Sequence, residues 1–296
     1  MTLPLPRGTR LPDRTVWLND RLVRGEDAAL SVFDRGARDG GAILETLRTY
    51  DGVPFAWDRH MERLVLSAAE LGFPVPPAPT TLRDAVDEVL AAEGLRDAVV
   101  RITVTRGVPG GRPVRTGAWV EAESLGGRLW AGTRTAHADG APLGARVIRS
   151  HVPFAAGWLG RHKTTSRLAW DLAREEARAA GVDEALLLSS ARELLEGAAS
   201  NVFVVRADGV LVTPPIEADV LPGVTRALVL ASARDRGLDV RETAIPDAVL
   251  ATAREVFLTN SVQEVLPVRE LDGRGIPERA VGARLWAAHR ERVAPR

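Results

Sequence analysis

The sequence predicts an α+β protein of two domains. Helix-like and strand-like segments interleave in both halves of a chain of 296 residues, which is long enough for two domains. With 45% apolar residues the chain can bury a substantial core. A weakly patterned stretch rich in glycine and small residues, at 124–142, separates the halves. We therefore expect domains at 1–127 and 143–296, joined by an interdomain loop at 128–142.

In the first half we expect a hairpin, further strands and two helices. Asn19 and Asp20 stand between two short apolar segments, which is a hairpin pattern. Asp58 suits a helix N-cap, and Thr81 opens a sequence that resembles a capping box. The helices should end at Gly72 and Gly94. The expected strands are at 29–33, 42–50, 99–105 and 119–122.

In the second half the apolar periodicity again alternates between helix and strand. Residues 164–180 predict a helix that stops at Gly181. Asp208-Gly209 is the strongest hairpin signal in the chain. The other expected elements are strands at 185–188, 201–205, 210–213, near Val240 and at 256–258, helices after Gly223 and Pro246, and an amphipathic helix at the C-terminus.

The composition excludes several classes of protein. Basic and acidic residues number 39 each, so no basic field suggests nucleic acid as a partner. The absence of cysteine excludes disulfides, thiolate metal sites and cysteine nucleophiles. The five histidines lack metal-site spacing, and no apolar run approaches the roughly 20 residues of a membrane helix. We expect a soluble cytoplasmic protein that binds neither a metal nor a membrane.

One residue, Lys163, is the only lysine in the chain, because the other 38 of the 39 basic residues are arginine. Arginine effectively never deprotonates. Only an amine that can lose its proton attacks a carbonyl and forms a Schiff base. Lys163 is therefore a candidate covalent catalyst, most simply an anchor for pyridoxal phosphate. The alternative is a leftover surface lysine in an arginine-biased chain.

Two glycine-containing segments of the second half suit a cofactor. Glu196 precedes Gly197, where backbone can approach a ligand closely, and an anionic group can keep a pyridine nitrogen protonated. The alternative for Glu196 is a solvated turn carboxylate. Val224 and Thr225 follow Gly223 at the start of a predicted helix, where N–H groups and the helix dipole suit a phosphate. As an alternative, Thr225 is only a helix cap.

Three further sets of residues could bind a phosphate or a substrate. The small polar side chains of 259–261, Asn260 and Ser261 among them, follow a strand and suit a second phosphate or a substrate wall. Arg106 and Arg112 flank a glycine-rich loop and could hold a carboxylate bidentately. The alternative for residues 259–261 is an ordinary strand end, and the alternative for the glycine-rich loop is a flexible hairpin. Arg63 lies on a predicted amphipathic helix, where a lone arginine is usually a solvated charge.

Taken together, these residues resemble the fold-type IV pyridoxal-phosphate enzymes. That family includes branched-chain aminotransferases, D-amino acid aminotransferases and 4-amino-4-deoxychorismate lyases. The resemblance covers nearly everything from Val16 to Val268, and its motifs occur in family order. They are DRG…G…ET (34–46), HMERL (60–64), TRG (105–107), HKTTSRL (162–168), GVDEALLL (181–188), LEGAASNVFVV (195–205), TPP (213–215), LPGVTR (221–226) and EVFLTNSVQEVLPV (255–268).

The resemblance implies roles for individual residues. Lys163 matches the Schiff-base lysine, Glu196 the partner of the pyridine nitrogen, and Leu221 the residue packed against the cofactor ring. The phosphate is expected to be held by Arg63, Val224, Thr225 and Ser261, with Val224 acting through its backbone N–H. The resemblance also implies a homodimer with pyridoxal 5'-phosphate, in which a small α/β domain precedes a larger domain that carries the cofactor lysine and has a β-barrel-like core.

Within the family, the chain is most similar to aminodeoxychorismate lyases. Thr46 follows the glutamate of the ET motif, as in the lyases, where this threonine is tied to proton handling during elimination. Arg112 matches a lyase arginine with one residue of loop-length difference. Branched-chain enzymes usually have a tyrosine at the position of Leu168 and Gly-Thr-Ala at 260–262. The expected reaction releases pyruvate and forms p-aminobenzoate, with Arg106, Arg112 and Asn260 binding the substrate.

The chain also departs from the family pattern. Two aromatic residues that usually line the substrate pocket are replaced, by Asp39 and Leu44. The alternative is therefore a class IV aminotransferase. It would act on branched-chain or D-amino acids, or on an amine, with a 2-oxo acid as the acceptor. A protein of another class, a non-catalytic binding protein that keeps the fold, is disfavoured by the retention of Lys163.

Overall fold

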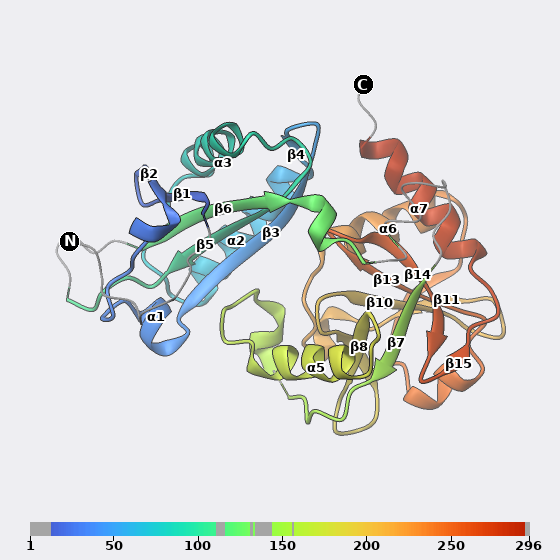
Figure 1. Ribbon diagram of the computed structural model, residues 1–296. Coiled ribbons are helices and arrows are strands. Elements are labelled where there is room, and N and C mark those ends of the chain that lie inside the picture. The colour runs from blue at the N-terminus through green and yellow to red at the C-terminus, as the bar shows by residue number, and fades with distance from the viewer. Residues whose placement is uncertain (1–12, 111–115, 131–132, 134–143, 156, 294–296) are drawn as a thin grey trace. The chain divides into compact units, whose positions relative to one another are not determined.

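The computed structural model of the chain describes residues 13–110, 116–130, 133, 144–155 and 157–293. These residues form two compact units (Figure 1). Unit 1 contains the chain up to Arg128 together with Lys163–Ser166, and unit 2 contains Leu129–His162 and Arg167 onward. Most of the expected interdomain loop at 128–142, namely residues 131–132 and 134–142, lies outside the described residues.

Among the described residues, unit 1 is built on a six-stranded antiparallel sheet with the order β2-β1-β6-β5-β3-β4. Its strands are β1 (Thr15–Leu18), β2 (Arg21–Arg24), β3 (Ala42–Tyr50), β4 (Val53–Pro54), β5 (Ala98–Thr105) and β6 (Ala118–Ser124). Its helices are η1 (Gly25–Asp27), α1 (Arg35–Asp39), α2 (Trp57–Glu70), α3 (Pro79–Glu93) and η2 (Leu125–Arg128).

Helices α2 and α3 pack on one face of this sheet. In α3, Leu82, Val86 and Val89 recur at helical spacing, are fully buried, and join the core formed with β3, β5 and β6. Pro79 suits the first turn because its missing N–H has no helical partner there. The helix ends at Gly94, whose φ of +63° is the left-handed conformation that glycine adopts without strain.

In the described part of the chain, unit 2 contains a nine-stranded sheet. Its main order is β12-β11-β10-β13-β14-β7-β8-β9, and β15 pairs with β14. Its strands are β7 (Ala145–Arg149), β8 (Glu184–Leu188), β9 (Leu194–Gly197), β10 (Asn201–Val205), β11 (Leu211–Thr213), β12 (Val240–Glu242), β13 (Glu255–Asn260), β14 (Glu264–Leu271) and β15 (Arg274–Gly275). Its helices are η3 (Gly157–Arg161), α5 (Leu168–Ala179), η4 (Ile216–Ala218), α6 (Val224–Asp235), η5 (Asp247–Ala251) and α7 (Ala280–Val293).

The central strands of unit 2 are buried on both faces, which explains their continuous apolar sequence. In β10, Val202 and Val204 belong to one apolar cluster, whereas Phe203 and Val205 pack on the other side with residues of α6 and α7. Phe203 stacks on Phe257 of β13, with ring centroids 4.9 Å apart. The expected α+β fold is confirmed, and this curled sheet corresponds to the expected barrel-like core.

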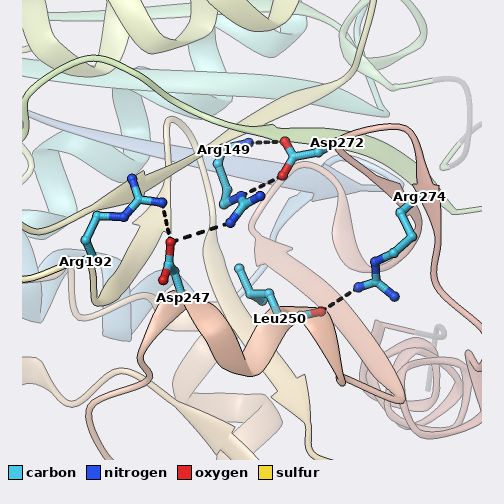
Figure 2. A network of polar contacts seen from close by, with 6 residues as sticks. All are labelled: Arg149, Arg192, Asp247, Leu250, Asp272 and Arg274. Carbon is cyan, nitrogen blue, oxygen red and sulfur yellow. Dashed lines mark hydrogen bonds and ion pairs between the residues drawn. The ribbon is translucent and has the colours of Figure 1, made fainter.

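A surface network of arginines and aspartates joins several ends of these strands (Figure 2). Arg149, at the end of β7, donates from its backbone N–H and its Nε to Asp272, at 2.8 and 2.6 Å. Asp247, at the start of η5, accepts from both Arg149 and Arg192. Arg274 donates to the carbonyl of Leu250 at 2.5 Å. These side chains range from 17% exposed at Asp247 to 63% exposed at Arg192, so solvent screens the ion pairs and each contributes about 1 kcal/mol.

Four local expectations are wrong. Thr81 opens no capping box, because α3 begins at Pro79 with Ala78 as its N-cap and has no side-chain cap. Residues 29–33 form no strand, because Ser31 accepts the N–H of Asp34 in a turn that leaves Phe33 exposed. Helix α2 begins at Trp57 and has Ala56 as its N-cap, so Asp58 lies in the first turn. Residues 164–167 are not helical.

No helix among the described residues is long and apolar enough to cross a membrane.

Candidate active site

Lys163 lies on a short extended segment that pairs with the start of β3. The Leu44 N–H donates to the Lys163 carbonyl at 2.8 Å, and the Thr165 N–H donates to the Ala42 carbonyl at 2.9 Å. Ile43 and Thr164 form the antiparallel bridge between these two bonds. The lysine segment, Lys163–Ser166, is therefore attached to β3 by an isolated β-bridge within unit 1, which explains why it is not helical.

The hydroxyl groups of this segment attach it to Gly40. Thr165 Oγ1 and Ser166 Oγ both donate to the Gly40 carbonyl, at 2.8 and 3.0 Å. Gly40 has a φ of +64°, and a Cβ there would lie 2.9 Å from Ser166 Oγ. Glycine is required both by the backbone conformation and by the close approach. Backbone and side-chain bonds thus both fix the position of the lysine segment in unit 1.

Arg63 is held in unit 1 by Glu45 of β3. Its Nε donates to Glu45 Oε1 at 2.8 Å, and its Nη2 donates to Oε2 at 2.6 Å. His60, one turn earlier on α2, has its Nδ1 2.7 Å from the same Oε2. The Arg63 side chain is only 10% exposed, so it is not the solvated charge that a lone helical arginine usually is. This bidentate pairing fixes the plane of the guanidinium.

Opposing effects act on the Glu45 carboxyl. Burial raises its pKa, but the charge and hydrogen bonds of Arg63, with those of His60, outweigh burial and lower the pKa to about 2. Glu45 is therefore ionised at neutral pH although it is 1% exposed. Its part in the site was not foreseen from the sequence. The available signal was the spacing of His60 and Arg63, three residues apart on one helix face.

The other candidate residues of unit 1 have different surroundings. Thr46 is half-buried on β3 and is paired in register with Arg101 of β5. The Arg106 guanidinium lies 5.0 Å from the ring centroid of Phe73 and donates to the Leu71 carbonyl. Arg106 is thus attached to the end of α2. Arg112 lies outside the described residues.

In unit 2 the structure brings Glu196 and Leu221 together. Glu196 is 4% exposed, so it is not a solvated turn carboxylate. The Leu221 N–H donates to its Oε2 at 3.1 Å. The indole Nε1 of Trp170, on α5, donates to its Oε1 at 2.9 Å. No local sequence pattern indicates this tryptophan, which lies 26 residues from Glu196.

The turn that follows Glu196 is held from two sides. Glu184 Oε2 accepts the Ala199 N–H at 2.9 Å and the Ser200 hydroxyl at 3.0 Å. Asn260 Nδ2 donates to the Ala199 carbonyl at 3.1 Å. Burial raises the pKa of the Glu184 carboxyl, although these donors oppose the change. At Gly197 a Cβ would lie 2.3 Å from Ser200 Oγ, so the turn requires glycine.

The start of α6 lies beside this turn. Asn201 Nδ2 donates to the Leu221 carbonyl at 2.9 Å, and a Cβ on Gly223 would lie 1.9 Å from Asn201 Oδ1. Gly223 is the N-cap of α6, and no side chain caps the helix. The N–H groups of its first turn, including those of Val224 and Thr225, have no partner within the helix and carry its positive dipole end. This is a donor set suited to a phosphate.

The ends of β10 and β13 complete this region. Asn201 is paired in register with Thr259. Asn260 Oδ1 accepts the N–H groups of Val262 and Gln263, at 2.9 and 2.6 Å, so this side chain shapes the turn that carries the half-buried Ser261. Among the described residues, Thr259 Oγ1 is buried and makes no hydrogen bond. A buried hydroxyl of this kind suits a ligand that can pair with it.

Each unit, taken by itself, contains residues that fit a part of pyridoxal phosphate. Unit 2 supplies a buried carboxylate at Glu196, an uncapped helix start at Val224, and the unpaired hydroxyl of Thr259. Unit 1 supplies the lysine amine and an oriented guanidinium at Arg63. Within the described residues, no three His, Asp or Glu side chains are grouped so that they could hold a metal ion.

Comparison with known proteins gives consistent matches over most of the chain. Residues 42–271 match the family model described as amino-transferase class IV. A putative branched-chain-amino-acid aminotransferase of Methanocaldococcus jannaschii is 35% identical over 275 residues, which are 90% of this chain and 91% of that protein. A D-alanine aminotransferase of Listeria innocua is 31% identical, over 87% of this chain and 88% of that protein.

A solved structure agrees with these relatives. The branched-chain aminotransferase of the thermophilic archaeon Thermoproteus uzoniensis, crystallised with norvaline, superimposes with a TM-score of 0.83 at 30% identity. The match covers 95% of this chain and 94% of that one. A further branched-chain amino acid aminotransferase, solved in complex with N-(5'-phosphopyridoxyl)-L-glutamate, matches with a TM-score of 0.81.

Proposed function

Because the chain belongs to the class IV aminotransferase family, we propose that it is a pyridoxal-phosphate-dependent aminotransferase that transfers the amino group of branched-chain amino acids to a 2-oxo acid. The observation that carries this proposal is the 35% identity to the M. jannaschii relative over 90% of the chain. The lyase activity expected from the motifs shares the fold, but the relatives named above are aminotransferases.

The proposed roles follow the chemistry of the side chains. The cofactor supplies an electron sink for the negative charge that develops at the substrate carbon. The Lys163 amine would hold the cofactor covalently, and as a free amine it would move a proton at the substrate carbon as general base and acid. Glu196 would keep the pyridine nitrogen protonated, and Leu221 would pack against the ring.

The phosphate is held by several donors in this proposal. They are the N–H groups of Val224 and Thr225 and the hydroxyl of Ser261 and, as the resemblance to fold-type IV enzymes implies, the guanidinium of Arg63. Arg63 can serve this role because Glu45 keeps its plane fixed. Asn260 supports the Ser261 turn, and Arg106 and Arg112 remain candidates for a substrate carboxylate.

A second candidate function is the 4-amino-4-deoxychorismate lyase. Specific residues favour it. Thr46 is half-buried and suited to proton handling in elimination, and Leu168 stands where branched-chain enzymes usually have a tyrosine. Asp39 and Leu44 also replace the usual aromatic residues of the pocket.

A product assay tests the proposal. Purified protein with pyridoxal phosphate is given L-valine, L-leucine, L-isoleucine and D-alanine, each with 2-oxoglutarate, and separately 4-amino-4-deoxychorismate. We expect branched-chain 2-oxo acids, and a loss of about 10²- to 10⁴-fold or more in Lys163→Arg, which has no amine for proton transfer. Formation of p-aminobenzoate with pyruvate, without 2-oxo acids from the amino acids, would establish the lyase instead.

We also propose that the chain forms a homodimer. Leu168 and Leu172 lie one turn apart on α5 and are 74% and 47% exposed. Two leucines on adjacent turns present an apolar surface that a second copy of the chain can cover. A dimer is also what the resemblance to fold-type IV enzymes implies.

A further inference from the structure

Each oxygen of the Glu196 carboxylate accepts a hydrogen bond, one from a backbone N–H and the other from a side chain. The Leu221 N–H, 3.1 Å from Oε2, is part of the backbone and is present whatever the side chain. The Trp170 indole N–H, 2.9 Å from Oε1, depends entirely on the residue at position 170. Because Glu196 is 4% exposed, water has little access to replace a lost donor.

Trp170 is itself held in place from two sides. Its ring meets Phe154 edge to face, with centroids 4.7 Å apart and an interplanar angle of 86°. The Arg167 guanidinium lies 5.5 Å from the centroid of the Trp170 ring. Arg167 also donates to the carbonyl of Ala198, two residues after Glu196, at 2.9 Å. The tryptophan and the Glu196 turn are therefore attached to each other by two separate contacts, both within unit 2.

An indole N–H can donate but cannot accept a hydrogen bond. The indole N–H can therefore bond a carboxylate oxygen only when that oxygen accepts. This favours the ionised form of the carboxyl group and fixes its plane. We infer that Trp170 is a positioning residue, which orients the Glu196 carboxylate and keeps it charged for its part opposite the pyridine nitrogen. This inference rests on the role proposed above for Glu196.

The test replaces the indole with a ring that has no N–H. Trp170→Phe keeps an aromatic ring near Phe154 and Arg167 but removes the donor. Trp286→Phe is a matched control, because the Trp286 indole also donates to a buried glutamate, Glu264, at 2.9 Å. Both variants lose one indole-to-carboxylate bond in unit 2, but only one of these bonds involves the candidate site.

Two properties of the cofactor are measured in both variants. One is its dissociation constant from the apoprotein, and the other is the pH midpoint of its visible absorption band. In Trp170→Phe we expect about tenfold weaker cofactor binding, the scale of one charge-assisted hydrogen bond partly lost. We also expect the midpoint to move in the same direction as in Glu196→Gln, but by less. Trp286→Phe should change thermal stability and leave both cofactor properties at their wild-type values.

Glu196→Gln separates failure of this inference from failure of the proposed function. If Glu196→Gln changes both cofactor properties and folded Trp170→Phe changes neither, the positioning role is wrong and the role of Glu196 stands. If Glu196→Gln also leaves both unchanged, the role of Glu196 is wrong, and the inference fails with it. An equal effect in Trp170→Phe and Trp286→Phe would reduce Trp170 to a structural residue.

A measurement on the wild-type holoprotein covers the case in which Trp170→Phe does not fold. The chain has seven tryptophans, whose indole N–H signals can be followed by ¹H–¹⁵N NMR. We expect downfield, slowly exchanging indole signals from both Trp170 and Trp286, of which only the Trp170 signal moves upfield in Glu196→Gln. If all seven signals keep their positions in that variant, the indole does not hold the carboxylate and the inference is overturned.

Discussion

At the scale of single residues, Glu45 shows how pairing can outweigh burial. The unfolded chain holds this carboxyl near its ordinary pKa of 4.5, whereas the folded chain lowers the pKa to about 2. Between these values the unfolded state binds more protons than the folded state, so stability rises with pH. The contribution of Glu45 is therefore complete above pH 4.5 and is lost as the pH falls toward 2.

We predict that Glu45→Gln removes this pH dependence. The variant should lose roughly 3 kcal/mol of unfolding free energy at pH 7, an order-of-magnitude figure from the change in pKa. Its loss should be much smaller near pH 2, where the wild-type carboxyl is itself half protonated. Urea unfolding followed from about pH 7 to about pH 2.5 measures this difference.

Glu62→Gln is the matched control for that series, because Glu62 is an exposed glutamate on the same helix, α2. It should leave the stability curve close to that of the wild type. If Glu45→Gln and Glu62→Gln give the same curve, the ion pair with Arg63 does not stabilise unit 1 as described.

At the scale of elements, the lysine segment illustrates what a sequence pattern can and cannot predict. The periodicity predicts one helix over 164–180, and the helix is present from Leu168 to Ala179. The residues before it pair instead with β3, more than a hundred positions earlier. Local periodicity contains no information about so distant a partner, so long-range pairing overrode the local expectation.

Among the other elements and contacts, those with a local sequence signal were predicted and those that join distant segments were not. The hairpin at Asn19 and the helix end at Gly94 were predicted correctly, because their signals are local. The pairing of Glu45 with Arg63 and of Trp170 with Glu196 was not foreseen, because it joins different elements. Lys163 could be singled out as a candidate catalyst because the chain has no other lysine.

Gly40 allows a prediction at this scale. Gly40→Ala places a Cβ at a φ of +64° and 2.9 Å from Ser166 Oγ. We expect a loss of about 1–2 kcal/mol from the left-handed backbone alone, together with detachment of the lysine segment. Hydrogen exchange of the Leu44 and Thr165 amides, which are paired in the wild type, should become faster.

Gly52→Ala separates these two effects. Gly52 has a φ of +84°, but a Cβ there meets no atom within 4 Å. Gly52→Ala should cause backbone strain similar to that of Gly40→Ala, while the Leu44 and Thr165 amides stay protected from hydrogen exchange. Equal exchange in both variants would mean that the contact at Gly40 does not hold the segment.

At the scale of the whole molecule, the exposed leucines of α5 lead to a prediction about assembly. We expect the wild-type protein to sediment with twice its chain mass of 31.8 kDa. Leu168→Asp combined with Leu172→Asp should yield monomers, because a charged pair cannot be buried in an apolar interface. Analytical ultracentrifugation over a range of concentrations measures this change.

Val75→Asp is the control for the assembly prediction. Val75 is 91% exposed and lies in the loop between α2 and α3, so the same kind of substitution there should leave the dimer intact. A wild-type protein that remains monomeric at all concentrations would contradict the proposal of a homodimer.

The placement of the lysine segment in unit 1 also has a consequence for synthesis on the ribosome. The last strand of that unit before the segment, β6, ends at Ser124, and the segment ends 42 residues later, at Ser166. At roughly 5–20 residues per second, translation needs about 2–8 s to cover that distance. During this interval the nascent chain contains the start of β3 with its bridge partner not yet made. The Lys163 amine thus belongs to the last part of unit 1 that the ribosome delivers.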